Sequence, residues 1–420
     1  MLVLHSHRDV SRVERLFGEE ELADLAAWRD ITQDDVRSVW LAKQSTYHRT
    51  LQHQRASMFD ERQVLSSRDP LPAGLWVVQP WPTNPMLWRH HRFFVRTWLA
   101  VTSVLPLKVY MLQDSWAHIV AKPYRADQLL SSYKDACVHL WSTERCSVTH
   151  AHRVLRTNHE AFTEGLVGVP RAAVPLDDRG EPAQKLFWRR RVWPWLEDAA
   201  VRVVASVWKD LSMYERLLRA SAEAGTLAPY RRVALLSLDW VIDEGGRPVL
   251  VDVDVDGGVA SEELPLSRRY ALDALQLLGV DGYEREEYAD KADSAIDGFC
   301  GKQQQMAQQQ QRQQQQQGSA AAAAGAEPPR AAPCGASGRA ALHDTVDEAH
   351  HAGSFARLFP PVGQRGCGHY CDFFETGGAA YSHDDHLLWA FLKQHGGLLP
   401  PRARLEDKKP KLGGKASTKL

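Results

Sequence analysis

The sequence has no excess charge of either sign and few cysteines. Lysine and arginine number 51 and aspartate and glutamate number 52 in 420 residues, which gives a formal net charge of −1. This balance provides no overall attraction to nucleic acid or to an anionic membrane surface. The six cysteines occur at irregular spacings, which indicates no disulfide framework and favours a reducing compartment.

Long apolar runs are also missing. No stretch of about eighteen apolar residues occurs, and the start of the chain is charged too early for a secretory signal. With 44% hydrophobic residues the chain can still bury a large core, and its length suggests two or three structural units. We therefore expect a cytoplasmic protein.

The most informative stretch that is present is residues 233–257, VALLSLDWVIDEGGRPVLVDVDVDG. Two β-rich runs, 233–242 and 249–255, flank a turn that carries two glycines and a proline. This pattern predicts a β-hairpin.

The hairpin gathers carboxylates. A loop over residues 244–247 would pair Asp243 with Pro248 and place Asp239 opposite Asp252. Because side chains alternate along a strand, Asp254 lies on the same face as Asp252. Close carboxylates repel unless a cation lies among them, and Mg²⁺ often bridges one or two carboxylates to nucleotide phosphates. The alternative is an edge strand whose charged face limits aggregation.

The same aspartates also satisfy a calcium-loop pattern. Residues 252–263 match D-x-D-x-D-G-x-x-x-x-x-E in full. Such a loop must follow an entering helix, and Gly245, Gly246 and Pro248 do not build one. We therefore do not expect a calcium site here.

Strands are predicted upstream of the hairpin. Residues 75–79, 92–101, 107–111 and 116–120 are short apolar or β-branched runs, and the second and third are joined by a short loop, so an antiparallel sheet is expected. Arg96 lies inside one of these runs. An arginine within a strand needs either an acidic partner or an anionic ligand, and both alternatives stay open.

Helices are predicted over residues 196–218, 268–278 and 386–394. The first carries an apolar stripe formed by Leu196, Ala200, Val203, Val204, Val207, Leu211, Tyr214 and Leu218. The glutamine- and alanine-rich residues 303–339 are predicted to form a disordered insert, of which part could be transiently helical.

The C-terminal region offers two weaker patterns. Cys367, His369 and Cys371, with His350 and His351 upstream, allow a zinc site, but without a second ligand pair structural thiols and surface histidines are favoured. The lysine-rich tail after residue 407 is a solvated basic run that could also bind an acidic partner.

Five segments of the chain share one further likeness. They are VWLAKQSTYHRTLQ (39–52), VVQPWPTNPMLW (77–88), RFFVRTWLAV (92–101), PLKVYMLQDSWAHIVAKPY (106–124) and LSLDWVIDEGGRPVLVDVDVD (236–256). In this order they resemble the tubulin–tyrosine ligase-like family of ATP-grasp enzymes. The family patterns include V-Q-K-Y-I-x-N-P-L-L, K-F-D-I-R-x-W-V-L-V and a hairpin that ends in L-L-E-V-N.

This resemblance implies an α+β fold with ATP-grasp-like antiparallel sheets flanked by helices. It also implies an ATP- and Mg²⁺-dependent ligase that adds tyrosine, glutamate or glycine to tubulin tails through an acyl-phosphate. By position, the nucleotide-binding residues would be Lys43, Gln79 and Arg92, the Mg²⁺ ligands Asp239, Asp252 and Asp254, and the catalytic substrate-orienting residue Arg96. The expected partner is tubulin or the microtubule, in the cytoplasm, cytoskeleton or cilium.

The departures from the family pattern fall at the site. Thr50 and Gln52 stand where glycines of the phosphate loop are expected, and Pro80 replaces the lysine of V-Q-K-Y. Phe94 replaces the aspartate of K-F-D-I-R, and His118 replaces an arginine. The metal-binding glutamate and asparagine of the family are both aspartates, Asp252 and Asp254.

Two hypotheses follow. Either the chain is a ligase with a degenerate nucleotide site, or it is an inactive pseudoenzyme that keeps the fold as a tubulin-binding module. The degenerate site also gives a partial likeness to a divergent member of the family whose ligase activity is doubtful. The expected domains are a ligase-like domain over residues 1–300, a low-complexity linker over 301–343 and a helical segment with a basic tail over 344–420.

Overall fold

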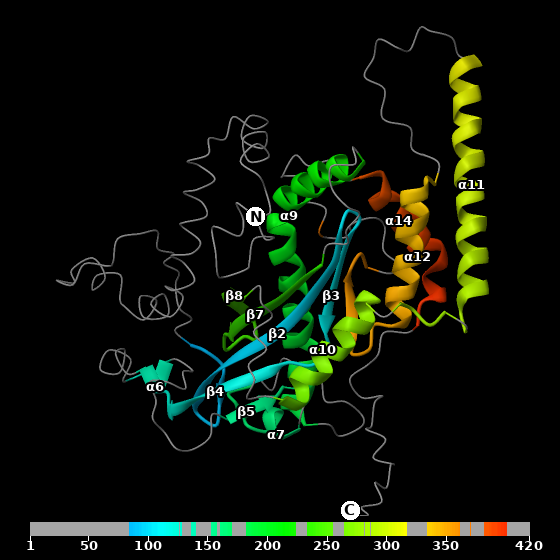
Figure 1. Ribbon diagram of the computed structural model, residues 1–420. Helices are drawn as coiled ribbons and strands as arrows, with labels where there is room; N and C mark the ends of the chain where they lie inside the picture. Colours follow the sequence, from blue (N-terminus) through cyan, green and yellow to red (C-terminus); the bar gives the residue numbers. More distant parts are fainter. Residues whose placement is uncertain are drawn as a thin grey trace, which may run out of the picture. The chain divides into compact units, whose positions relative to one another are not determined.

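The structure is a computed structural model, shown in Figure 1. It describes residues 84–125, 127, 136–139, 153–157, 160–169, 182–223, 233–254, 264–280, 282–285, 287–316, 334–361, 370 and 382–400. The elements expected before residue 84 lie outside these ranges. No helix in the described ranges is long and apolar enough to cross a membrane.

The described elements alternate irregularly between strands and helices. In chain order they are β1 (Leu87–Trp88), β2 (His91–Val104), β3 (Leu107–Leu112), β4 (Trp116–Pro123), α6 (Ala136–His139), β5 (Arg153–Arg156), α7 (Glu160–Thr163), β6 (Leu166–Val167), α8 (Ala183–Phe187), η3 (Trp188–Val192), α9 (Trp193–Glu223), β7 (Ala234–Ile242), β8 (Pro248–Asp254), α10 (Leu264–Leu278), α11 (Ala289–Gln316), α12 (Ala336–His350), β9 (Phe355–Phe359), α14 (His383–His395) and η7 (Gly396–Leu398). Every strand pairing whose register is defined among them is antiparallel. The predicted α+β class with antiparallel sheet and flanking helices is confirmed.

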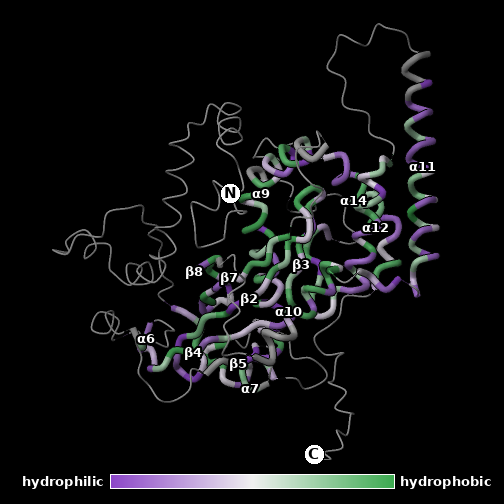
Figure 2. Tube along the Cα trace, viewed as in Figure 1, coloured by the Kyte–Doolittle hydropathy of each residue, from purple (hydrophilic) through white to green (hydrophobic). Residues whose placement is uncertain are grey.

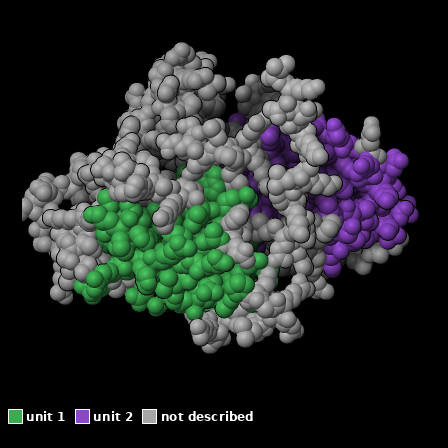
Figure 3. Space-filling model, turned by 90° about the horizontal axis from the view of Figure 1, so that it is seen from below, with its two compact units in different colours: residues 1–96, 115–196, 237–256 green, residues 97–114, 197–236, 257–420 purple. Residues whose placement is uncertain are grey.

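The chain divides into two compact units, which are coloured separately in Figure 3. Unit 1 takes residues 1–96, 115–196 and 237–256, and unit 2 takes residues 97–114, 197–236 and 257–420. The domain boundary expected at residue 343 falls inside α12.

Unit 1 is built on the first part of β2. Here β2 pairs with β4, with Phe94 opposite His118 and Arg96 opposite Trp116, and β4 pairs in turn with β5. The same sheet includes β1, which pairs with β2 and β6, and the hairpin of β7 and β8. Phe94, Val120 and Val241 form a small buried cluster between these strands. The apolar runs that predicted strands over residues 92–101 and 116–120 thus contribute Phe94 and Val120 to the packing of unit 1.

Unit 2 is built on the second part of β2. This part pairs with β3, which pairs on its other side with β9. All six residues of β3 are buried, and the strand is among the apolar parts of the trace in Figure 2. The rings of Trp98, Tyr270 and Phe355 join β2, α10 and β9, with both centroid distances at 5.8 Å. Contacts between distant segments thus hold this sheet.

The long helix α9 confirms the apolar stripe predicted from residues 196–218, with one correction. Val207, which was placed on the stripe, is 39% exposed, whereas its neighbour Trp208 is buried. The Trp208 indole N–H donates to the Val104 carbonyl oxygen over 3.1 Å. Burial of the Trp208 ring, whose N–H keeps a hydrogen bond, stabilises the fold more than burial of Val207 would. The helix is therefore rotated so that Trp208 faces the core and Val207 faces solvent.

The glutamine run is helical up to Gln316, because it continues α11. The first half of this helix packs Ile296 and Phe299 into a cluster with α12 and α14. Once such a turn is anchored, propagation is easy, and glutamine is a good helix former. Residues 317–333 of the expected insert lie outside the described residues.

The cysteines correct the sequence expectation. Cys300 in α11 and Cys334, two residues before α12, form a disulfide with a Cα–Cα distance of 5.3 Å, and Cys137 is also disulfide-bonded. Spacing along the sequence could not show this, because the pairing depends on α11 packing against α12. The bond joins a residue just before the glutamine- and alanine-rich insert to one near its C-terminal end.

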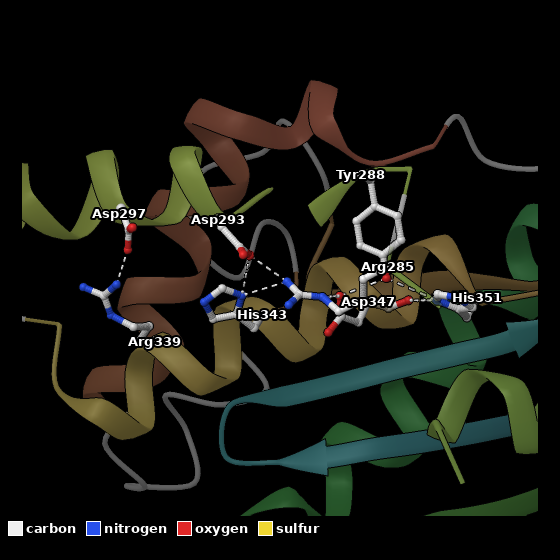
Figure 4. A network of polar contacts seen from close by, with 8 residues as sticks. All are labelled: Arg285, Tyr288, Asp293, Asp297, Arg339, His343, Asp347 and His351. Carbon is white, nitrogen blue, oxygen red and sulfur yellow. Dashed lines mark hydrogen bonds and ion pairs between the residues drawn. The ribbon is translucent and has the colours of Figure 1, made fainter. Parts of the chain in front are cut away.

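A polar network also fastens α11 to α12 (Figure 4). Asp347 accepts hydrogen bonds from Arg285 Nε and from the Tyr288 hydroxyl, both over 2.9 Å. Arg285 also pairs with Asp293 over 2.7 Å. His350 stacks on Tyr288 with ring centroids 3.9 Å apart, and burial lowers the pKa of this histidine. His350 is still exposed, which agrees with the surface-histidine alternative to zinc, while Cys367, His369 and Cys371 lie outside the described residues.

The most deeply buried ion pair among the described residues lies in unit 2. Lys108 in β3 donates to Glu348 Oε1 in α12 over 2.7 Å, and neither side chain is more than 2% exposed. The second Glu348 oxygen accepts from the hydroxyls of Thr102 and Tyr110, each over 3.0 Å. Burial, with the Glu348 carboxylate beside it, raises the pKa of Tyr110 and keeps its hydroxyl a donor. The side-chain donors of Lys108, Thr102 and Tyr110 all bind the Glu348 carboxylate.

Replacing Glu348→Gln leaves a buried ammonium without a counter-ion. We expect the free energy of unfolding to fall by roughly 3–5 kcal/mol, since removal of one partner of a buried pair leaves an uncompensated charge. Urea titration followed by circular dichroism measures it. The control is Asp127→Asn in the exposed Arg125–Asp127 pair, where the loss should stay below about 1 kcal/mol. Equal effects in the two variants would contradict the network.

The disulfide makes a separate prediction. Peptide mapping of the unreduced protein should recover Cys300 and Cys334 in one cross-linked peptide. A reducing agent, or the variant Cys300→Ser, should lower the stability of unit 2 by about 2–4 kcal/mol. The reducing agent should have a smaller effect on the variant than on the parent. Recovery of both residues as free thiols would contradict the assignment.

Candidate functional site

The β7–β8 hairpin places Asp239 directly opposite Asp252, as the sequence predicted. The pairing at the turn was predicted wrongly, because Ile242 and not Asp243 pairs with Pro248. The register shifts between Trp240, opposite Leu250, and Asp239, so Val251 is an extra residue in β8. This bulge offsets the error at the turn and restores the opposition of the two aspartates.

Asp243 instead closes the turn. Its backbone N–H donates to the Arg247 carbonyl oxygen over 2.9 Å, and its Oδ1 accepts from the Arg247 N–H over 2.7 Å. An aspartate that bonds nearby backbone groups favours a turn over a continued strand. This preference explains why the strand pairing stops one residue earlier than predicted.

Arg96 on β2 binds Asp239 on β7 through two parallel hydrogen bonds. Arg96 Nε lies 2.7 Å from Asp239 Oδ1, and Arg96 Nη2 lies 2.6 Å from Asp239 Oδ2. The side chains are 11% and 5% exposed. Of the two alternatives left open for Arg96, the structure has the acidic partner. The bidentate geometry fixes the orientation of the Asp239 carboxylate and supplies its countercharge.

The predicted Mg²⁺ ligands are brought together only in part. Asp252 is half-buried, and its Oδ1 accepts from the Val253 N–H over 2.9 Å. Asp254 lies opposite Ser237, but its side chain is outside the described residues. Within the described part of the chain no three His, Cys, Asp or Glu side chains group closely enough to hold a metal ion. The three-aspartate site therefore stays a prediction.

The donor chemistry of the two described aspartates fits a hard divalent cation. Mg²⁺ takes oxygen ligands and commonly uses one or two protein carboxylates, with phosphate and water in the other positions. Asp239 would have to share its oxygens between the cation and Arg96. The calcium-loop alternative does not fit, because Asp252 and Asp254 belong to a strand and not to a loop that follows a helix.

Two departures from the family pattern face each other. Phe94 on β2 is paired with His118 on β4, two residues along β2 from Arg96. Phe94 is buried, and it packs with Val120 and Val241. Since the family carries an aspartate and an arginine at these positions, an apolar surface and an imidazole here replace two charges. The sequence showed both changes, and the strand register shows that they are neighbours.

Arg92 is buried rather than presented on a surface. Its Nη1 lies 2.9 Å from His139 Nδ1, and its guanidinium lies 4.0 Å from the centroid of the Tyr124 ring. Burial lowers the pKa of Arg92 from its usual value. Tyr124 belongs to the Pro-Tyr of the family-like segment and could have been found from the sequence. His139 could not, because no pattern connects it to a residue 47 positions earlier.

Several predicted site residues lie outside the described residues. These are Lys43 and Gln79, and also Thr50, Gln52 and Pro80, where the family pattern is broken. Their roles stay predictions.

The Arg96–Asp239 pair can be tested by replacing the arginine. In Arg96→Gln the buried Asp239 carboxylate loses its countercharge, and we expect a loss of roughly 3 kcal/mol of stability. Millimolar Mg²⁺ should restore part of this loss in the variant and change the parent less. Thermal unfolding with and without Mg²⁺ measures both effects. Arg125→Gln, which removes an exposed pair with Asp127, is the control. A variant as stable as the parent would show that the Arg96–Asp239 pair does not stabilise the fold.

One comparison with known proteins gives a match. Residues 16–158 match the model of the Tubulin-tyrosine ligase family. No curated protein shows a significant match to the chain. The matched range contains four of the five family-like segments, including β2 with Arg96, whereas the acidic hairpin lies beyond it. The narrower likeness to the divergent member tubulin–tyrosine ligase-like protein 12 is not confirmed. The match over residues 16–158 supports a tubulin-tyrosine ligase-like protein, as the sequence motifs predicted.

Proposed function

We propose that the chain is an ATP-dependent tubulin amino-acid ligase-like protein with an altered nucleotide site. The observation that carries the proposal is the hairpin register that sets Asp239 opposite Asp252, with Arg96 bound to Asp239 in two hydrogen bonds. Two carboxylates and an adjacent arginine are the kinds of group that phosphoryl transfer requires for positioning and charge neutralisation.

The proposed reaction has two steps. A carboxylate is phosphorylated by ATP to an acyl-phosphate with release of ADP, and an amine then displaces phosphate and forms the amide. Bound Mg²⁺ supplies neutralisation of the phosphate charge, and Asp239, Asp252 and Asp254 would hold it. Arg96 keeps the Asp239 carboxylate in one orientation, which is the usual role of a hydrogen-bond partner behind a metal ligand.

The remaining proposed contacts are with the nucleotide and the partner. Lys43, Gln79 and Arg92 are proposed to bind or position ATP, and Arg92 would do so from its buried place beneath Tyr124. The proposed protein substrate is tubulin, through its acidic tails, and the amino acid transferred is tyrosine, glutamate or glycine.

A second candidate function is an inactive tubulin- or microtubule-binding module. Two observations favour it. The Asp239 carboxylate is already neutralised by Arg96, and Phe94 and His118 stand where the family pattern places an aspartate and an arginine beside Arg96. A fold that no longer needs a cation at Asp239 could persist as a binding surface alone.

Calorimetric titration with Mg·ATP tests the proposed function. We expect micromolar binding by the full chain and loss of this binding in the variant Asp252→Asn. Asp252 is half-buried, and its replacement leaves the Arg96–Asp239 pair intact. Circular dichroism of the variant checks its fold. A screen of tyrosine, glutamate and glycine with tubulin then identifies the product. No binding at millimolar Mg·ATP would overturn the ligase.

Co-sedimentation with microtubules separates the two candidates. A binding module should sediment equally with and without ATP, and Asp252→Asn should leave its affinity unchanged. A ligase should lose turnover in the same variant. Failure of both binding and turnover would exclude both functions.

A further inference from the structure

The surface at the tip of the β7–β8 hairpin carries two arginines around one tryptophan. Arg191 lies in η3, Trp195 in the first turn of α9 and Arg247 in the turn before β8, all within unit 1. The Arg191 guanidinium is 4.6 Å from the centroid of the Trp195 ring, and the Arg247 guanidinium is 5.9 Å from it. We refer to these three residues as the arginine–tryptophan surface.

This surface is held in place by the backbone beneath it. Arg191 Nε donates to the Gly245 carbonyl oxygen over 3.2 Å. Gly246 has φ +87, and a Cβ at that position would lie 2.9 Å from Phe187 and 3.2 Å from Val192. The absence of a side chain thus lets the hairpin turn approach α8 and η3 closely. The two arginines therefore come from separate segments that are fixed to each other.

Neither guanidinium has a carboxylate partner among the described residues. Asp243 and Glu244 are close to Arg247 in the sequence. However, the Asp243 carboxylate accepts from the Arg247 backbone N–H, and the Glu244 carboxylate accepts from the Asn84 side chain over 3.4 Å. Arg247 is exposed, and Arg191 and Trp195 are half-buried. This differs from Arg96, Arg125 and Arg202, each of which pairs with an aspartate. Two fixed positive charges thus remain open to an anionic partner.

We infer that the arginine–tryptophan surface binds an acidic peptide segment. An arginine stacked on an aromatic ring keeps its N–H groups for in-plane contacts, and the guanidinium fork matches a carboxylate in two hydrogen bonds. Because both guanidiniums lie near the Trp195 ring, that ring is not a free platform for a nucleobase. Binding of single-stranded nucleic acid depends on such stacking, so a peptide of glutamates or aspartates is the better fit.

The inference rests on the proposed function only for the identity of the acidic peptide that is bound in the cell. A tubulin tail is one acidic peptide, and under the proposed function the surface would hold it while the chemistry occurs elsewhere in unit 1. The surface itself needs neither ATP nor Mg²⁺. Its test can therefore be separated from the test of the ligase.

The experiment is fluorescence anisotropy of a labelled oligoglutamate peptide with the full chain, at low salt and without ATP or Mg²⁺. The variant Arg191→Ala/Arg247→Ala should weaken binding at least about tenfold, because two charge-assisted contacts are lost. Arg247→Ala alone should weaken it less and should leave the turn intact, since the Arg247 side chain makes no hydrogen bond to the described residues. Arg125→Ala is the matched control, and it should bind as the parent does.

Three results would overturn the inference. The first is unchanged peptide affinity in a double variant whose circular dichroism matches the parent. The second is a lack of peptide binding by the parent at low salt. The third is equally tight binding of a single-stranded oligonucleotide that is lost in the same double variant, which would make the surface a general polyanion site. Peptide binding without any Mg·ATP binding would leave this inference standing and the ligase overturned.

Discussion

The Arg96–Asp239 ion pair is the constraint on which the arrangement of unit 1 depends. It connects β2 to β7 through two charged hydrogen bonds at a nearly buried position, where either charge alone would be costly. The aspartate needs the arginine for neutralisation, and the arginine needs the aspartate to justify its place in an apolar strand. If the hairpin moved away from β2, both charges would lose their partner at a nearly buried position, which is energetically unfavourable. A nucleotide-bound metal would find the Asp239 carboxylate already oriented and already neutralised.

Much of this arrangement could be predicted from the sequence, because local patterns carry it. Short apolar or β-branched runs predicted β2, β3 and β4, two such runs around a Gly- and Pro-containing turn predicted the hairpin, and the period of the apolar stripe predicted α9. The opposition of Asp239 and Asp252 followed from counting outward from the turn. That count was right only because the bulge at Val251 cancels the shorter turn at Asp243. A bulge leaves no mark in a pattern of alternation, so the register could not be derived in full.

Contacts between distant segments could not be predicted. Arg96 was known to need either an acid or an anion, but nothing in its neighbourhood named Asp239. The Arg92–His139 contact and the Cys300–Cys334 bond likewise depend on packing that no local pattern encodes. The family resemblance supplied positions for the site, and the match over residues 16–158 supports the family. The pairing of Phe94 with His118 shows that changes seen singly in the sequence form one altered patch.

The Lys108–Glu348 pair has a consequence for how the chain is made. The two residues are 240 positions apart, and the glutamine- and alanine-rich insert lies between them. During synthesis β3 leaves the ribosome long before α12. Lys108 therefore stays hydrated and unpaired with Glu348 until the chain beyond the insert has emerged. Pairings this distant slow folding and keep apolar surface exposed for longer. Unit 2 thus completes its core late, and ribosome pausing within the repeats would lengthen the time for which the nascent chain is vulnerable to aggregation.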